Sequence, residues 1–162
     1  MRKKPDLSIR ARALQYLARR EYSRAELRSR LLAHVQTDDH HEHLQPDDLD
    51  ALLDDLTARG WLSDARAVTQ LLHAKRSRFG AQRIAQELRR KGIAEELIGE
   101  ALPGLKETEL DVARRVWQKK YGALPRDDKE KARQVRFLQS RGFSMEVIFK
   151  ILQADNPEDG PF

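Results

Sequence analysis

Hydrophobic residues recur along this chain at the three- and four-residue spacing that places them on one face of an α-helix. No stretch alternates hydrophobic and polar residues over the length of a strand. The pattern therefore predicts an all-α protein built from nine short helices. The apolar faces of these helices begin at Ile9, Leu27, Leu49, Val68, Ile84, Leu97, Leu110, Ala132 and Val147.

Capping residues and helix breakers indicate where these helices begin and end. Ser23 with Glu26 three residues later forms a capping box that starts the second helix. Pro46 suits the first turn of the third helix, where its missing N–H costs little. Pro103-Gly104 is expected to end the sixth helix. Three glycines that directly follow a basic residue are expected in the left-handed conformation after a helix: Gly60, Gly92 and Gly142.

The predicted helices form an internal repeat. Leu31 aligns with Leu88 at an offset of 57 residues, and Leu88 aligns with Leu138 at an offset of 50. We expect three three-helix repeats, at 1–60, 61–104 and 105–154, followed by a flexible C-terminal tail at 155–162. Each repeat is too small to bury much surface alone. The repeats are therefore expected to stack as an elongated, curved array, with a single compact bundle as the alternative.

Charge is distributed unevenly along the chain. The whole sequence carries 31 Lys and Arg against 26 Asp and Glu, a net charge of +5. Residues 37–64 carry −8, whereas residues 1–36 carry +7, 65–104 carry +4 and 105–162 carry +2. Cysteine is absent, which excludes disulfides and zinc sites built on sulfur. The sequence shows neither a membrane span nor a secretory signal, so we expect a cytoplasmic protein.

The sequence contains no motif that indicates an enzyme. It has no glycine-flanked nucleophile turn, glycine-rich phosphate loop or dinucleotide fingerprint. No catalytic residue, cofactor or metal site is therefore expected. The histidines at 40–43 fall in a polar connection where nothing fixes a coordination geometry. The acidic helix at 46–59 could brace neighbouring repeats, repel DNA from one face or simply be solvated, and the sequence does not separate these roles.

Basic residues offer the strongest candidate interaction surface. Lys129, Arg133 and Arg136 recur at i, i+4 and i+7 and form one stripe on a predicted helix. Such a surface would attract phosphates or an acidic partner. The alternative is that these cations serve solubility and the negative ends of helices. The candidate partner- or DNA-contacting residues are Arg83, Arg89, Lys91, Lys129, Arg133, Arg136 and Arg141.

The chain from about Ala11 to Leu152 resembles the RecX family, the regulatory proteins of the RecA recombinase. The resemblance rests on four stretches in family order: Ala13-Leu14 to Leu31, Gly60-Trp61-Leu62-Ser63-Asp64-Ala65-Arg66, Phe79-Gly80 to Ile93, and Arg136-Phe137-Leu138 to Ser144. It departs at Ser63, where the family usually has a second aspartate. The structural residues it implies are Asp64, Phe79, Gly80, Gly92, Ile93, Gly142 and Phe143.

The resemblance implies a function as well as a fold of tandem three-helix repeats. RecX-like proteins bind the RecA nucleoprotein filament and suppress its ATPase, strand-exchange and co-protease activities in recombination, DNA repair and the SOS response. They also bind single- or double-stranded DNA weakly and without strong sequence preference. The resemblance thus implies a non-enzymatic regulator, expected to be monomeric. The alternatives are a DNA-binding regulator that acts without RecA and a helical scaffold for unrelated proteins.

Overall fold

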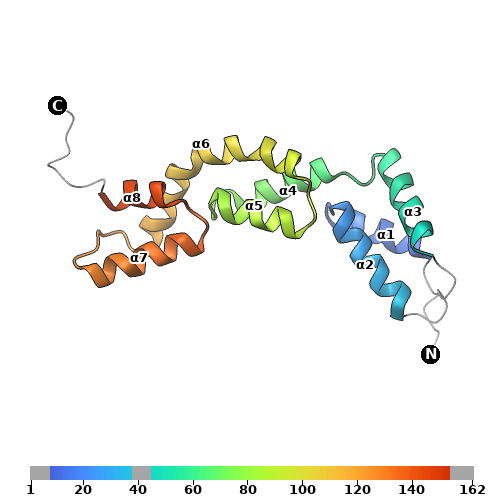
Figure 1. The fold of residues 1–162 in the computed structure, drawn as a ribbon, viewed down its shortest axis with the longest axis horizontal. Coiled ribbons are helices and arrows are strands. Elements are labelled where there is room, and N and C mark those ends of the chain that lie inside the picture. The colour runs from blue at the N-terminus through green and yellow to red at the C-terminus, as the bar shows by residue number, and fades with distance from the viewer. Residues whose placement is uncertain (1–7, 38–44, 154–162) are drawn as a thin grey trace. The chain divides into compact units, whose positions relative to one another are not determined.

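The computed structural model describes residues 8–37 and 45–153, and every regular element within these ranges is a helix (Figure 1). The predicted all-α class is therefore confirmed. The helices are α1 (Ile9–Arg19), α2 (Arg24–Thr37), α3 (Pro46–Ala58), α4 (Asp64–Lys75), α5 (Ala81–Arg90), α6 (Glu95–Lys120), α7 (Asp128–Ser140) and α8 (Met145–Gln153).

The chain folds as two compact units. The N-terminal unit comprises the residues up to Gln70 together with Arg90–Ala94. The C-terminal unit comprises Leu71–Arg89 and the residues from Glu95 onward. Helix α4 thus contributes residues to both units.

In the N-terminal unit α2 packs against both α1 and α3 (Figure 1). Leu27 and Leu31 of α2 and Leu53 and Leu56 of α3 are fully buried in a shared core. Burying such leucines provides the main driving force for folding in a unit of this size. Helix α2 begins at the predicted capping box, and α3 has its predicted proline in the first turn.

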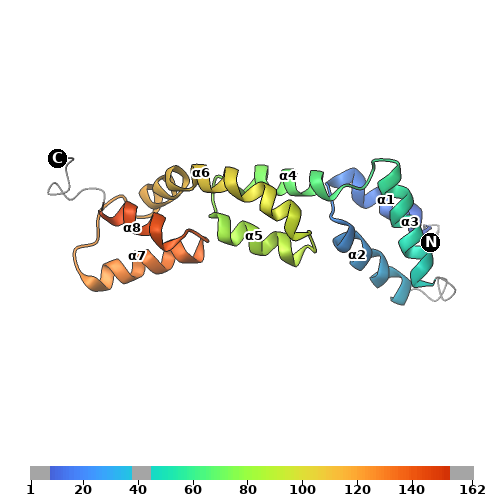
Figure 2. The ribbon, with the colours of Figure 1, turned by 45° about the horizontal axis from the view of Figure 1, so that its top comes forward.

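In the C-terminal unit α8 packs against both α6 and α7 (Figure 2). Phe143 and Ile148 lie in the core that these three helices share. The indole of Trp117 is buried and donates a hydrogen bond to the Gln134 side chain at 2.8 Å. The buried carboxylate of Glu109 accepts a hydrogen bond from the backbone N–H of Ser144, just before α8. These polar contacts fix the spacing of α6, α7 and α8.

The expected break at Pro103-Gly104 is wrong, because α6 runs through it as one helix. The count is therefore eight helices in the described residues instead of nine. Ile98, Leu105 and Val112 are spaced by seven residues and are all buried, so one apolar stripe continues through the proline. Burial of this stripe outweighs the helical hydrogen bond that Pro103 cannot donate, a loss of about 3 kcal/mol.

The glycines expected after helices have positive φ angles, 74° at Gly60 and Gly92 and 86° at Gly142. Two of them also lie at close approaches between segments. A side chain at Gly142 would meet the backbone of Arg83 in the C-terminal unit. A side chain at Gly92 would meet Ala25 in the N-terminal unit. Only glycine satisfies both the conformation and the space at these turns.

Some expectations concern residues that the structure does not describe. The histidine tract 40–43 and the tail 155–162 lie outside the described residues. Within 8–37 and 45–153, no group of three or more His, Asp or Glu side chains could hold a metal ion. No helix in the same ranges is both long and apolar enough to cross a membrane.

Candidate functional site

The acidic face of α3 neutralises arginines within its own unit. The carboxylates of α3 form ion pairs with guanidinium groups of α1 and α2. The pairs are Arg10–Asp55 at 2.8 Å, Arg24–Asp54 at 2.8 Å and Arg28–Asp50 at 3.0 Å. Exposed pairs of this kind contribute little to stability, because water and salt screen them. Their larger effect is to remove three N-terminal cations from the set that could bind an external anion.

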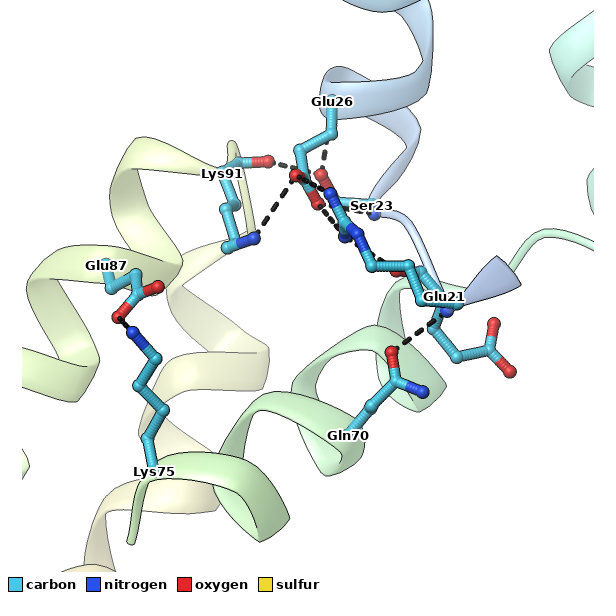
Figure 3. A network of polar contacts seen from close by, with 8 residues as sticks. Glu21, Ser23, Glu26, Gln70, Lys75, Glu87 and Lys91 are labelled. Carbon is cyan, nitrogen blue, oxygen red and sulfur yellow. Dashed lines mark hydrogen bonds and ion pairs between the residues drawn. The ribbon is translucent and has the colours of Figure 1, made fainter. Parts of the chain in front are cut away.

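The carboxylate of Glu26 forms ion pairs with two further cations (Figure 3). It pairs with Arg20 at 3.1 Å and with Lys91 at 3.2 Å, and it accepts a hydrogen bond from the Ser23 backbone N–H. Burial alone would raise the pKa of the Glu26 carboxyl, but the hydrogen bonds from Arg20, Ser23 and Lys91 outweigh it. The pKa is therefore held below its ordinary value. Lys91, a predicted contact residue, is bound within the N-terminal unit.

Arg89, another predicted contact residue, is paired within the C-terminal unit. Its guanidinium contacts Glu95 at 2.7 Å, and this hydrogen bond raises the pKa of Arg89 and lowers that of Glu95. Lys75 pairs in the same unit with Glu87 at 3.2 Å (Figure 3). The sequence groups Arg89 and Lys91 with the other cations, but the structure gives both a carboxylate partner.

Arg83 and Arg141 gather around the ring of Phe79. The guanidinium carbon of Arg83 lies 4.2 Å from the ring centroid and that of Arg141 lies 5.4 Å from it. Arg83 also donates a hydrogen bond to the Ser140 carbonyl at 2.9 Å. The backbone N–H of Gly80 donates to the Arg141 carbonyl at 2.8 Å. This cluster fixes the C-terminal end of α7 against the N-terminal end of α5.

The basic stripe predicted on α7 has no interaction partner among the described residues. Lys129, Arg133 and Arg136 are exposed, and within residues 8–37 and 45–153 their side chains make no hydrogen bond, ion pair or ring contact. Their helix is capped at its N-terminus by Asp127, whose side chain accepts a hydrogen bond from the Glu130 backbone N–H at 2.8 Å. These three cations therefore remain available to an external anion.

Near this stripe lies a cavity of about 420 Å³, which we call the basic pocket. Its wall combines five cationic side chains with one aromatic ring and has no carboxylate. The lining residues are Ser77, Arg78, Arg115, Val116, Lys119, Lys120, Phe137 and Arg141. Of these, the sequence-based contact set contains only Arg141. The run of basic residues at the end of α6 could have indicated this pocket from the sequence. Only the fold shows that these residues line it together with Arg78 and Phe137.

The structural residues suggested by the sequence lie at turns and in cores. The Asp64 carboxylate accepts a hydrogen bond from the Arg24 backbone N–H at 2.8 Å, at the start of α2. Ile93 and Phe143 are buried, with 5% and 2% of their surface exposed. A side chain at Gly80 would collide with the backbone of Gly142. At the departure from the family pattern, the Ser63 hydroxyl accepts a hydrogen bond from the Arg66 backbone N–H at 3.2 Å.

Comparison with known proteins matches two family domains to this chain, both beyond residue 62. The second three-helix domain of RecX matches residues 63–102, and the third matches residues 107–152. A protein of Leptothrix cholodnii named regulatory protein RecX is 46% identical over 157 residues, which cover 96% of this chain and 95% of that protein. The chain belongs to the RecX family. The RecX protein of Ralstonia nicotianae is 41% identical, over 91% of this chain and 87% of its own.

Solved structures agree with this RecX assignment at the level of the fold. The crystal structure of RecX from Lactobacillus salivarius matches with a TM-score of 0.72 and covers 90% of this chain and 93% of its own. Its sequence identity to this RecX-family chain is 17%. The relatives named above are regulatory proteins by name, so this chain belongs to a family of regulators.

Proposed function

We propose that this RecX-family chain binds the RecA nucleoprotein filament in the cytoplasm and inhibits its ATPase, strand-exchange and co-protease activities. The proposal rests on the family membership and on one observation, the free cations of the C-terminal unit. The stripe of Lys129, Arg133 and Arg136 and the basic pocket carry no carboxylate partner in the described residues. A nucleoprotein filament presents the phosphates and acidic side chains that such a surface attracts.

Inhibition follows if the chain binds the conformations of the filament unequally. A ligand shifts an equilibrium only by its difference in affinity for the two states. Binding that favours one arrangement of recombinase subunits would oppose the rearrangement coupled to ATP hydrolysis. We further propose that the chain acts as a monomer and binds single- or double-stranded DNA weakly without sequence preference. Electrostatic attraction would mainly speed the encounter and make it sensitive to salt.

The test reverses the charge of the α7 stripe. In the variant Lys129→Glu, Arg133→Glu and Arg136→Glu, we expect the concentration for half-maximal inhibition of the DNA-dependent ATPase of RecA to rise at least about tenfold. A matched control reverses three exposed cations elsewhere, Arg19, Arg30 and Lys106, with the same change in net charge. We expect this control to inhibit within about threefold of the wild type, since long-range charge is screened.

Circular dichroism spectra of both variants establish that the helices are intact. Equal inhibition by the stripe variant and the wild type would overturn the proposed contact surface. A chain that never inhibits the ATPase, yet binds DNA tightly without recombinase, would instead favour the regulator that acts without RecA.

A further inference from the structure

We propose that the basic pocket of the C-terminal unit binds one nucleotide of a single DNA strand. In this arrangement Lys119, Lys120 and Arg115 hold the phosphate and the base stacks on Phe137. The inference deepens the proposed function and rests on it, since it names where this unit meets nucleic acid. It is tested with DNA alone, so that the two proposals can fail separately.

The basic pocket is strongly cationic. Five cations line about 420 Å³ and no lining residue is acidic. Within the described residues, Arg78 and Arg115 donate hydrogen bonds only to the backbone carbonyls of Ala74 and Asp111, each at 3.5 Å, and Arg78 also lies 5.6 Å from the ring centroid of Phe79. In the N-terminal unit, by contrast, four arginines have carboxylate partners: Arg10, Arg20, Arg24 and Arg28. Like charges held together repel, and a bound anion relieves this repulsion.

Helix ends explain how the pocket keeps its cations without carboxylates. Lys119 and Lys120 lie in the last turn of α6, and Arg141 is the C-terminal cap of α7. The partial negative charge at a helix C-terminus favours such cations. Because this interaction uses the helix dipole, it leaves the N–H donors of the lysines and arginines available to phosphate oxygens.

One wall of the basic pocket is an aromatic ring. The ring of Phe137 lies in the pocket wall and is only half-buried. Tyr121 holds the ring edge to face, with centroids 5.6 Å apart and planes at 83°. Arg141 and Lys120 lie 5.2 Å and 5.4 Å from the centroid. A fixed ring beside cations is the arrangement on which single-stranded nucleic acids stack their bases.

Shape and chemistry together favour a single strand over the other polyanions. The cavity falls within the size range of small-molecule sites, so it can accept one nucleotide unit. The bases of a duplex are stacked inside the helix and cannot reach Phe137. An acidic peptide would satisfy the cations but would leave the ring without a stacking partner.

The experiment measures binding of a labelled oligothymidylate by fluorescence anisotropy over a salt series, without recombinase. The variant Lys119→Gln with Lys120→Gln removes two phosphate contacts, so the slope of log affinity against log salt should fall by about 1.4. Phe137→Leu should weaken binding at least about tenfold with the slope unchanged, and Phe137→Tyr should restore most of it.

Matched controls lie in the same unit outside the pocket. Lys106→Gln with Lys131→Gln removes two exposed cations, and Phe149→Leu removes an aromatic ring that is 39% exposed on α8. Both should leave affinity and slope as in the wild type. The fluorescence of buried Trp117 and the melting temperature report whether each variant is folded, and the lysine variant changes only exposed side chains.

The proposal is overturned if the lysine double variant and Phe137→Leu both bind the oligonucleotide with the affinity and the salt slope of the wild type. It is also overturned if inorganic phosphate or oligoglutamate of equal charge displaces the oligonucleotide as well as unlabelled oligothymidylate does. Loss of oligonucleotide binding with full inhibition of the RecA ATPase would support the pocket and reject its contribution to inhibition. Retained binding with no inhibition of RecA in the wild type would reject the proposed function alone.

Discussion

Gly142 meets two requirements that no other residue type satisfies together. Its φ is 86°, and a Cβ there would meet the backbone N and Cα of Arg83. We expect Gly142→Ala to lower the free energy of unfolding by more than about 2 kcal/mol, because conformational strain and a backbone collision both add to the cost. Urea denaturation monitored by circular dichroism measures this change.

Gly60 supplies the matched control for this substitution. Its φ is 74°, and a Cβ there would have no atom within 4 Å. Gly60→Ala should therefore cost only the left-handed strain, about 1 kcal/mol. Equal losses at Gly60 and Gly142 would show that the close approach to Arg83 contributes nothing.

Glu26 links stability to pH. Its pKa lies below the ordinary value of 4.5, because hydrogen bonds from Arg20, Ser23 and Lys91 outweigh burial. A depressed pKa in the folded state means that the unfolded state takes up the proton first as the pH falls. The contribution of Glu26 to stability is therefore complete above about pH 5 and is lost as the pH falls below the ordinary pKa.

The expected result is that stability depends less steeply on pH once Glu26 is replaced. Between about pH 5 and pH 3, the unfolding free energy of Glu26→Gln should fall less than that of the wild type. Glu100→Gln serves as the control, since Glu100 is exposed and, within the described residues, pairs with no cation. Urea titrations at several pH values measure the slopes, and parallel curves for Glu26→Gln and the wild type would contradict the prediction.

At the scale of helices, α3 controls how many cations the N-terminal unit exposes. Asp50→Asn with Asp54→Asn releases Arg28 and Arg24 from their ion pairs. Because these pairs are exposed, stability should fall by no more than about 1 kcal/mol per pair. Single-stranded DNA should bind more tightly, and the salt slope should rise by about 1.4 if both arginines reach phosphates. Anisotropy over a salt series measures both quantities.

The control for α3 changes the net charge equally without releasing an arginine. Asp47 and Glu100 are exposed and, within the described residues, have no cationic partner. Asp47→Asn with Glu100→Gln should therefore leave the slope unchanged. The same gain in affinity and slope from both double variants would mean that net charge alone determines binding.

The sequence predicts helix starts better than it predicts helix continuity. The capping box of Ser23 and Glu26 is a local signal, and so is Pro46, so the starts of α2 and α3 follow from a few adjacent residues. Pro103-Gly104 is an equally strong local signal for a break, yet α6 continues. The reason is the buried stripe through Ile98, Leu105 and Val112, whose burial depends on the rest of the unit. A local sequence pattern contains no information about the free energy of this burial.

At the scale of the whole molecule, the candidate site was only partly predictable. The stripe of Lys129, Arg133 and Arg136 follows from helical spacing alone. The pairing of Lys91 with Glu26 does not, because the two residues lie 65 positions apart. Arg89 pairs with Glu95, six residues later and on the next helix, which helical spacing does not predict either. The basic pocket joins three segments that are distant in sequence. Segment charges therefore reveal where cations are abundant, and only the fold reveals which of them are free.

This distribution of free cations predicts how the whole chain selects DNA. Lys and Arg side chains that reach phosphates carry no base information. A pocket that stacks one base on Phe137 reads no base edge, because every base presents a π-face. Selection from a random-sequence pool by the wild-type chain should therefore enrich no motif. The affinities of selected and unselected sequences should agree within about threefold at any one salt concentration.

A sequence-specific helix-turn-helix protein put through the same selection is the positive control, because such readers prefer their sites by a factor of about 10³ or more. The Phe137→Leu variant is informative in the same assay. It should bind more weakly than the wild type and still select no motif, since the ring contributes stacking affinity and not base discrimination. An enriched motif bound about 10³-fold more tightly than random DNA would contradict the filament-modulator function proposed for this RecX-family chain.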